Sequence, residues 1–128
     1  IVRNKRKIDA AITNARAVIA LRGALAAEAD AHRAGRMGEA PLTHLLRPRR
    51  SYPRHLGELV WLYQPSHQPR PRCAQEVPAQ TEESRALSLE LKRRGFVFVG
   101  PVTALALMSA IGITNTDIIG TWKRPLAE

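Results

Sequence analysis

Apolar residues repeat at helical spacing near the start of the chain and predict a helix over residues 4–21. Ile8, Ile12, Ala15 and Ile19 follow one another at intervals of four, three and four residues. Such intervals place side chains on one face of a helix. We expect this face to be buried.

The segment 23–56 has a different pattern. Its Ala-rich beginning predicts a weak helix, and two prolines in the following basic stretch predict a loop. The arginines of this loop are candidates for phosphate contacts, although a solvated insertion explains them equally well; they are Arg47, Arg49, Arg50 and Arg54. A short helix over 55–63 and a proline-rich, irregular connection over 64–78 follow.

The next helix has clear start and stop signals. Thr81 can cap its first turn, where Glu82 and Glu83 suit the helix dipole. Leu87 and Leu91 mark its buried face, and Gly95 supplies the left-handed residue that ends a helix.

Pro101 opens another helix, which runs to about Ile111 before Gly112. This segment is apolar almost all round, so we expect it to be buried on every side. The last residues, 113–128, predict a turn and a basic tail. The fold class indicated is all-α, in a single domain over 1–128.

Residues 82–111 therefore form two helices joined by a short connection with glycine at both ends. We expect Phe96 and Phe98 to be buried and to hold the turn against the flanking helices. Gly100 has no Cβ, so a ligand can approach its backbone closely. The N–H groups of Val102 and Thr103 lie in the first helical turn, where they lack intrahelical acceptors and favour an anion.

Lys92, Arg93 and Arg94 precede this turn, and we expect their side chains to reach phosphates. With Gly95, Gly100, Val102 and Thr103 they are the predicted DNA-binding residues. A tight helical corner with a solvated basic end is the alternative.

Charge and composition narrow the possible partners. Twenty Lys and Arg against 11 Asp and Glu give a net charge of +9, which favours a polyanion, with nucleic acid first. No apolar run approaches the roughly 18 residues of a spanning helix and no signal peptide opens the chain, so we expect a cytoplasmic protein without a membrane. Cys73 is the only cysteine, which excludes a disulfide within the chain.

Three segments carry a family resemblance. The stretch from Leu91 to Ala104, LKRRGFVFVGPVTA, resembles the signature of bacterial 3-methyladenine DNA glycosylase I. Residues 1–17 are similar to a family helix, and Leu59-Val-Trp61 resembles its tryptophan helix. The resemblance covers about 1–22 and 57–120 and leaves 23–56 as an insertion.

The resemblance implies an all-helical, helix-hairpin-helix glycosylase fold that hydrolyses the N-glycosidic bond of 3-methyladenine in double-stranded DNA. Such enzymes flip the damaged base out of the duplex and use no redox or organic cofactor. The family's base-pocket segment has no counterpart before Ile1, so we expect a fold incomplete at its N-terminus and a pocket largely absent.

Two further positions depart from the family or extend it. Its C-terminal zinc ligands would fall on Asp117 and Thr121, and threonine does not support zinc, so we expect no metal site. The wider superfamily often places a catalytic aspartate after the second hairpin helix, which makes Asp117 a candidate, although a turn residue is the favoured interpretation.

The leading hypothesis is a glycosylase portion that anchors the DNA backbone in base-excision repair. A non-enzymatic helix-hairpin-helix module for DNA binding is the alternative. A third hypothesis, an RNA-associated basic protein, is supported by the net charge alone.

Overall fold

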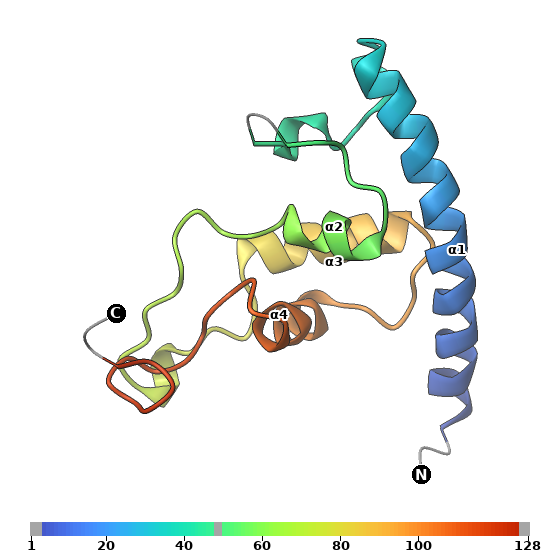
Figure 1. The fold of residues 1–128 in the computed structure, drawn as a ribbon. Helices are drawn as coiled ribbons and strands as arrows, with labels where there is room; N and C mark the ends of the chain where they lie inside the picture. Colours follow the sequence, from blue (N-terminus) through green and yellow to red (C-terminus); the bar gives the residue numbers. More distant parts are fainter. Residues whose placement is uncertain (1–3, 48–49, 126–128) are drawn as a thin grey trace. The chain divides into compact units, whose positions relative to one another are not determined.

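The computed structural model describes residues 4–47 and 50–125, and its described regular elements are helices (Figure 1). In chain order they are α1 (Lys5–Arg33), α2 (Leu56–Trp61), α3 (Glu82–Arg93) and α4 (Pro101–Ala110), with short 3-10 helices η1 (Met37–Glu39), η2 (Thr43–Leu45) and η3 (Ala74–Glu76). The expected all-α class is confirmed. Arg49, one of the loop arginines named above, lies outside the described residues.

The chain divides into two compact units, which are described separately. Unit 1 comprises Ile1–Leu62 and Glu90–Phe98, and unit 2 comprises Tyr63–Leu89 and Val99–Glu128. Unit 1 therefore holds α1, α2 and the end of α3, whereas unit 2 holds the start of α3 and all of α4.

Helix α1 is longer than its sequence pattern predicts. The Asn4 side chain caps it by accepting a hydrogen bond from the Arg6 N–H at 2.9 Å. The helix then continues through the exposed Gly23 to Arg33, so the expected end near Leu21 is wrong. Alanine is the best helix former, and the Ala-rich residues after Gly23 continue the helix into the segment interpreted as an insertion.

The predicted buried face of α1 is also wrong. Ile8, Ile12 and Ile19 are 47%, 50% and 73% exposed. The buried residues are instead Ala10, Ala17, Leu21, Leu25 and Ala31. The exposed and the buried face of α1 both carry apolar residues at helical spacing. The small side chains of the buried face allow other segments to pack closely, since a Cβ built on Gly95 would lie 4.0 Å from the Ala17 Cβ.

By length and composition alone, α1 could cross a membrane. This finding corrects the expectation that no apolar segment approaches the length of a membrane-spanning helix. The many alanines between the charged residues make α1 apolar enough to meet the test. The core helix of a soluble protein or a signal sequence meets the same test. Within unit 1, α1 is buried only in part, through residues such as Leu21 and Leu25.

Unit 2 contains the predicted cap of α3. The Thr81 hydroxyl accepts a hydrogen bond from the Ser84 N–H at 3.1 Å, and the Ser84 hydroxyl accepts one from the Thr81 N–H at 2.8 Å. This reciprocal pair satisfies donors that the first helical turn leaves without partners. Leu87, on the expected buried face, is fully buried.

Helix α4 is buried on one side only. Ala104, Leu105 and Met108 are buried, whereas Val102 and Leu107 are 57% and 41% exposed. The expectation of burial all round is therefore wrong, because composition reports how apolar a helix is and not how many of its sides are covered.

The end of unit 2 is held by two polar side chains. Gln68 donates a hydrogen bond to the Ile113 carbonyl at 3.0 Å and accepts one from the Asn115 N–H at 2.8 Å. Arg124 is buried and donates to the carbonyls of Pro69 and Asn115 at 2.6 and 3.1 Å. Within the predicted basic tail, Arg124 is therefore part of the packed structure of unit 2.

The two faces of α1 can be compared by truncation. Leu25→Ala should lower the free energy of unfolding by about 2–5 kcal/mol, because it removes buried methyl groups and leaves a cavity. The matched Ile19→Ala should change it by less than about 0.5 kcal/mol, because Ile19 is largely exposed. Denaturant titration measures both, and the opposite order would restore the face predicted from periodicity.

Candidate nucleic-acid interface

The three cations at the end of α3 differ in their environment. Lys92 and Arg93 are exposed, and Arg93 forms an ion pair with Glu90 at 2.6 Å while its side chain stays 53% exposed. The Glu90 side chain is only 12% exposed and accepts two hydrogen bonds from Arg93, so the pair is half-buried and the outer side of the Arg93 guanidinium faces solvent. Both residues are therefore accessible to a phosphate.

Arg94 is buried in unit 1, with a side chain only 7% exposed. Its Nη2 donates a hydrogen bond to the Glu28 Oε1 at 2.7 Å and its Nε donates to the Glu90 Oε1 at 2.8 Å, and its Nη1 also contacts Glu28. Because these carboxylates occupy the guanidinium, Arg94 is removed from the predicted phosphate contacts. Sequence alone did not reveal this, because Glu28 lies far from Arg94 along the chain.

The ionisation of this cluster reflects its pairing. The hydrogen bonds that Arg94 donates to Glu28, together with the one it donates to Glu90, hold the pKa of Arg94 above its ordinary value despite burial. Burial acts to raise the pKa of Glu90, but hydrogen bonds from Arg93 and Arg94 outweigh it and lower that pKa. Arg94 and Glu90 are therefore both charged at neutral pH.

Tyr52 joins this cluster to the loop before α2. Its hydroxyl donates a hydrogen bond to the Glu28 Oε1 at 2.7 Å and accepts one from the Leu42 N–H at 3.1 Å. Burial of the ring and then the bond to Glu28 raise the pKa of Tyr52 to about 12. Glu28 thus connects the loop, α1 and the end of α3 within unit 1.

The first half of the connection after α3 is fixed to α1. Gly95 has φ 93°, the left-handed conformation expected where a helix ends. Phe96 is buried, as predicted. Asn14 then holds Val97 by two hydrogen bonds, accepting from the Val97 N–H at 2.8 Å and donating to its carbonyl at 3.0 Å.

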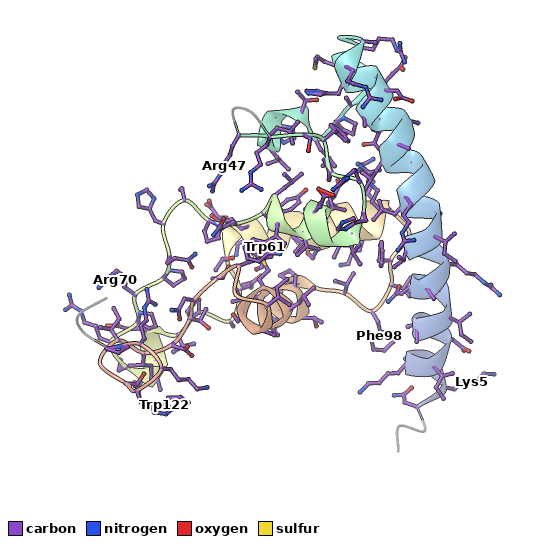
Figure 2. All side chains as sticks on the ribbon, in the orientation of Figure 1. Lys5, Arg47, Trp61, Arg70, Phe98 and Trp122 are labelled. Atoms are coloured by element: carbon purple, nitrogen blue, oxygen red, sulfur yellow. The ribbon has the colours of Figure 1, made fainter. Side chains whose placement is uncertain are left out.

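Phe98 differs from its prediction. It is 59% exposed, and its φ of 61° lies in the left-handed region that a bulky residue rarely adopts. Figure 2 shows its side chain on the side of the N-terminal half of α1. The expectation that both phenylalanines are buried is therefore correct only for Phe96, because the Asn14 contacts hold Val97 at the surface and Phe98 follows it.

Gly100 begins the second half, in unit 2, as the N-cap of α4. Its φ of −125° is extended backbone open to any residue, and a Cβ built on it meets nothing within 4 Å. The fold therefore does not require glycine here. Val102 and Thr103 are exposed in the first turn of α4, whose N–H groups lack intrahelical acceptors.

The arginine-rich loop of unit 1 borders a cleft of about 370 Å³. Arg50, His55 and Trp61 are among the residues that line it. Arg54 pairs with Glu58 at 2.8 Å and is otherwise exposed, and Arg47 is exposed as well (Figure 2).

Asp117 in unit 2 is half-buried and lines a surface cleft of about 410 Å³ with Thr121 and Trp122. Its N–H donates to the Asn115 Oδ1 at 2.9 Å, as in a turn. Among residues 4–47 and 50–125, no three His, Cys, Asp or Glu side chains gather as metal ligands.

Comparisons with known proteins agree with the resemblance. A family model described as methyladenine glycosylase matches residues 43–124. DNA-3-methyladenine glycosylase 1 of Escherichia coli (strain K12) is 39% identical over 66 residues, which are 49% of this chain and 35% of that protein. DNA-3-methyladenine glycosylase of Haemophilus influenzae is 48% identical over 42 residues, or 33% of this chain and 23% of that protein.

A crystal structure of 3-methyladenine DNA glycosylase I (TAG) is also similar, with a TM-score of 0.66 and 28% identity over 98% of this chain and 54% of that chain. The chain belongs to the methyladenine glycosylase family. It spans about a third or less of the length of the curated relatives it matches, and about half of the solved chain. The family match begins at residue 43, inside the segment interpreted as an insertion.

Several residues that shape this surface were missed by sequence reasoning. Glu28, Tyr52 and Asn14 act through partners distant in the chain, and nothing local marks them. A polar residue on the buried face of a helix would have been the only sign of such a partner in the sequence. This sign was missed in α1 because its buried face was assigned wrongly.

The contribution of Tyr52 can be tested through pH. The pKa of Tyr52 is raised above that of tyrosine in the unfolded chain. The contribution of its hydrogen bond with Glu28 to the free energy of unfolding is therefore complete below about pH 10, and it is lost as pH rises to about 12. The difference in free energy of unfolding between the wild type and Tyr52→Phe should therefore shrink by about 2 kcal/mol over this interval. Urea titrations at each pH measure it, and a constant difference would contradict the buried phenol–carboxylate bond.

Proposed function

We propose that this chain anchors the backbone of double-stranded DNA for a glycosylase that releases alkylated adenine. The observation that carries the proposal is the presence of a glycine at position 100. Neither its φ nor its surroundings require glycine, so the missing Cβ serves something outside the fold. A phosphate that approaches the backbone at the start of α4 is the ligand that explains this best.

Exposed groups within each unit also suit DNA phosphates. Val102 and Thr103 supply N–H donors at the positive end of α4, where negative charge is favoured. Lys92 and Arg93 are exposed cations at the end of α3. Contacts of these two kinds hold a DNA backbone without reading its sequence, as an enzyme that searches for damage needs.

The names of the relatives support the substrate class. Both curated relatives are DNA-3-methyladenine glycosylases, so we infer that the bound duplex carries 3-methyladenine and that the chain works inside the cell. Release of the base is hydrolysis of the N-glycosidic bond and needs no redox or organic cofactor.

The first test is Gly100→Val. It should weaken binding to duplex DNA about tenfold or more, because a branched side chain blocks the approach of a phosphate. Arg50→Ala, in the loop of unit 1, should weaken it by less. Fluorescence anisotropy with a labelled duplex measures both, and the denaturation midpoint is measured alongside because Gly100 is a helix cap. Equal losses from the two variants would contradict anchoring at Gly100.

The second test separates anchoring from catalysis. The chain is incubated with duplex DNA that contains 3-methyladenine, and the released base is quantified. We expect binding without release, because the role proposed for this chain is to hold the DNA backbone. Release would place the catalytic groups within this chain, and loss of that release in Asp117→Asn would assign one of them.

A non-enzymatic DNA-binding module also predicts binding without release. It differs in one respect: a module of that kind has no reason to prefer alkylated DNA. Competition between alkylated and unmodified duplexes of the same sequence distinguishes the two, since a glycosylase portion should favour the damaged duplex, whose weakened pairing lowers the cost of base flipping.

A further inference from the structure

The cleft of about 370 Å³ in unit 1 is formed by two adjoining segments, the loop 50–53 and helix α2. The residues that line it all belong to unit 1. The loop is held in place, because Pro53 is fully buried and the Tyr52 hydroxyl donates a hydrogen bond to Glu28. A cleft of this volume is large enough for a small organic ligand, and its loop is fixed by the fold before any ligand binds.

Helix α2 presents an uncovered aromatic ring at the cleft. Trp61 lines the cleft and is 43% exposed (Figure 2). Gly57 also lines it and precedes Trp61 by four residues, on the same face of the helix, so no side chain from that position lies beside the indole. Glycine is unfavourable inside a helix. A Cβ built on Gly57 would lie 3.2 Å from the His55 ring, so the glycine also leaves room for this imidazole.

The charged residues of the cleft leave one cation without a partner. The Glu58 carboxylate is paired with Arg54 at 2.8 Å, and the His55 Nε2 lies 3.3 Å from the same oxygen. Arg50 lines the cleft, and no carboxylate among residues 4–47 and 50–125 pairs with its guanidinium. An anion in the cleft would therefore meet a free guanidinium, whose planar donors match a phosphate well.

We propose that this cleft binds a nucleotide whose base is unpaired, with the base stacked on Trp61 and the phosphate bound by Arg50. An aromatic platform beside a cation holds single-stranded nucleic acid without reading its sequence. The net charge of +9 favours nucleic acid as the source of such an aromatic anion. A base within a duplex is covered by its neighbours on both faces, so the cleft should select unpaired nucleotides.

This inference goes beyond the proposed function, because it concerns other residues and another form of nucleic acid. Gly100 is proposed to hold the backbone of a duplex and belongs to unit 2, whereas Trp61 and Arg50 belong to unit 1. A free mononucleotide and a nucleotide within a single strand offer the same base and phosphate. The experiment therefore includes both.

The test observes Trp61 directly. Trp122→Phe leaves Trp61 as the only tryptophan, and it should preserve the fold because Trp122 is 86% exposed. The fluorescence of this variant is titrated at constant ionic strength with dAMP and with a short single-stranded deoxyadenylate oligomer. Both should quench it, because a base stacks on the indole. Deoxyadenosine, which lacks the phosphate, should bind about tenfold more weakly than dAMP.

A pair of arginine variants in the same background tests the phosphate contact. Arg50→Ala should raise the Kd for dAMP about tenfold and remove the preference for dAMP over deoxyadenosine. Arg22→Ala is the matched control, because it removes the same charge from an exposed position of α1 that does not line the cleft. It should change the Kd by less than about twofold. Both arginines are exposed, so the denaturation midpoints should stay close to that of the parent.

Several results would overturn the inference. These are the absence of quenching by either ligand, equal affinity for dAMP and deoxyadenosine, and equal losses from Arg50→Ala and Arg22→Ala, which would assign binding to net charge. Quenching by only one of the two ligands supports the site and identifies its source, a single strand for the oligomer and a free mononucleotide for dAMP.

The outcome is also separable from that of the proposed function. Failure of the wild type to bind duplex DNA overturns the anchoring role of Gly100 and leaves the quenching of Trp61 by dAMP as evidence for the cleft. Duplex binding without quenching of Trp61 has the opposite meaning: the anchor is supported and the nucleotide site is overturned.

Discussion

The buried ion cluster around Arg94 is the interaction on which the rest of unit 1 depends. One guanidinium bonds to Glu28 of α1 and to Glu90 of α3, and Glu28 also accepts the Tyr52 hydroxyl. Burying a charged group costs several kcal/mol unless groups of opposite charge surround it. Loss of one residue of the cluster would therefore leave the remaining charges buried without a partner. Because Arg94 directly precedes the hairpin connection, the cluster also fixes where that connection leaves α3.

Neighbouring cations of one sequence run therefore have different functions. Arg94 is paired with carboxylates inside unit 1, whereas Lys92 and Arg93 remain exposed. Successive residues of a helix point about 100° apart, so a helix end that buries one cation exposes the others. A basic run of three residues thus offers fewer cations to a ligand than its composition suggests.

What the sequence predicted well was set by local chemistry. Thr81 caps α3, Gly95 ends it in a left-handed conformation and Pro101 opens α4, as predicted, because each effect acts within one turn of the chain. The family resemblance was likewise carried by a continuous stretch of sequence, and it is confirmed.

What the sequence did not predict depends on distant partners. Periodicity identified α1 as a helix through Ile8, Ile12 and Ile19, whereas small alanines and leucines on another face form its buried side. That choice could not be made locally, since it depends on what packs against the helix. The pairing of Glu28 with Arg94 has the same origin, because only the folded chain brings the two residues together.

The hairpin connection shows where fold and function diverge. If the backbone alone decided the sequence, glycine would stand at position 98, where φ is 61°, and position 100, where φ is −125°, would carry an ordinary residue. The chain has the reverse, with phenylalanine in the strained position and glycine in the relaxed one. A sequence that departs from local consistency in this way points to a requirement outside the fold. At Gly100, the proposed approach of a phosphate would be such a requirement.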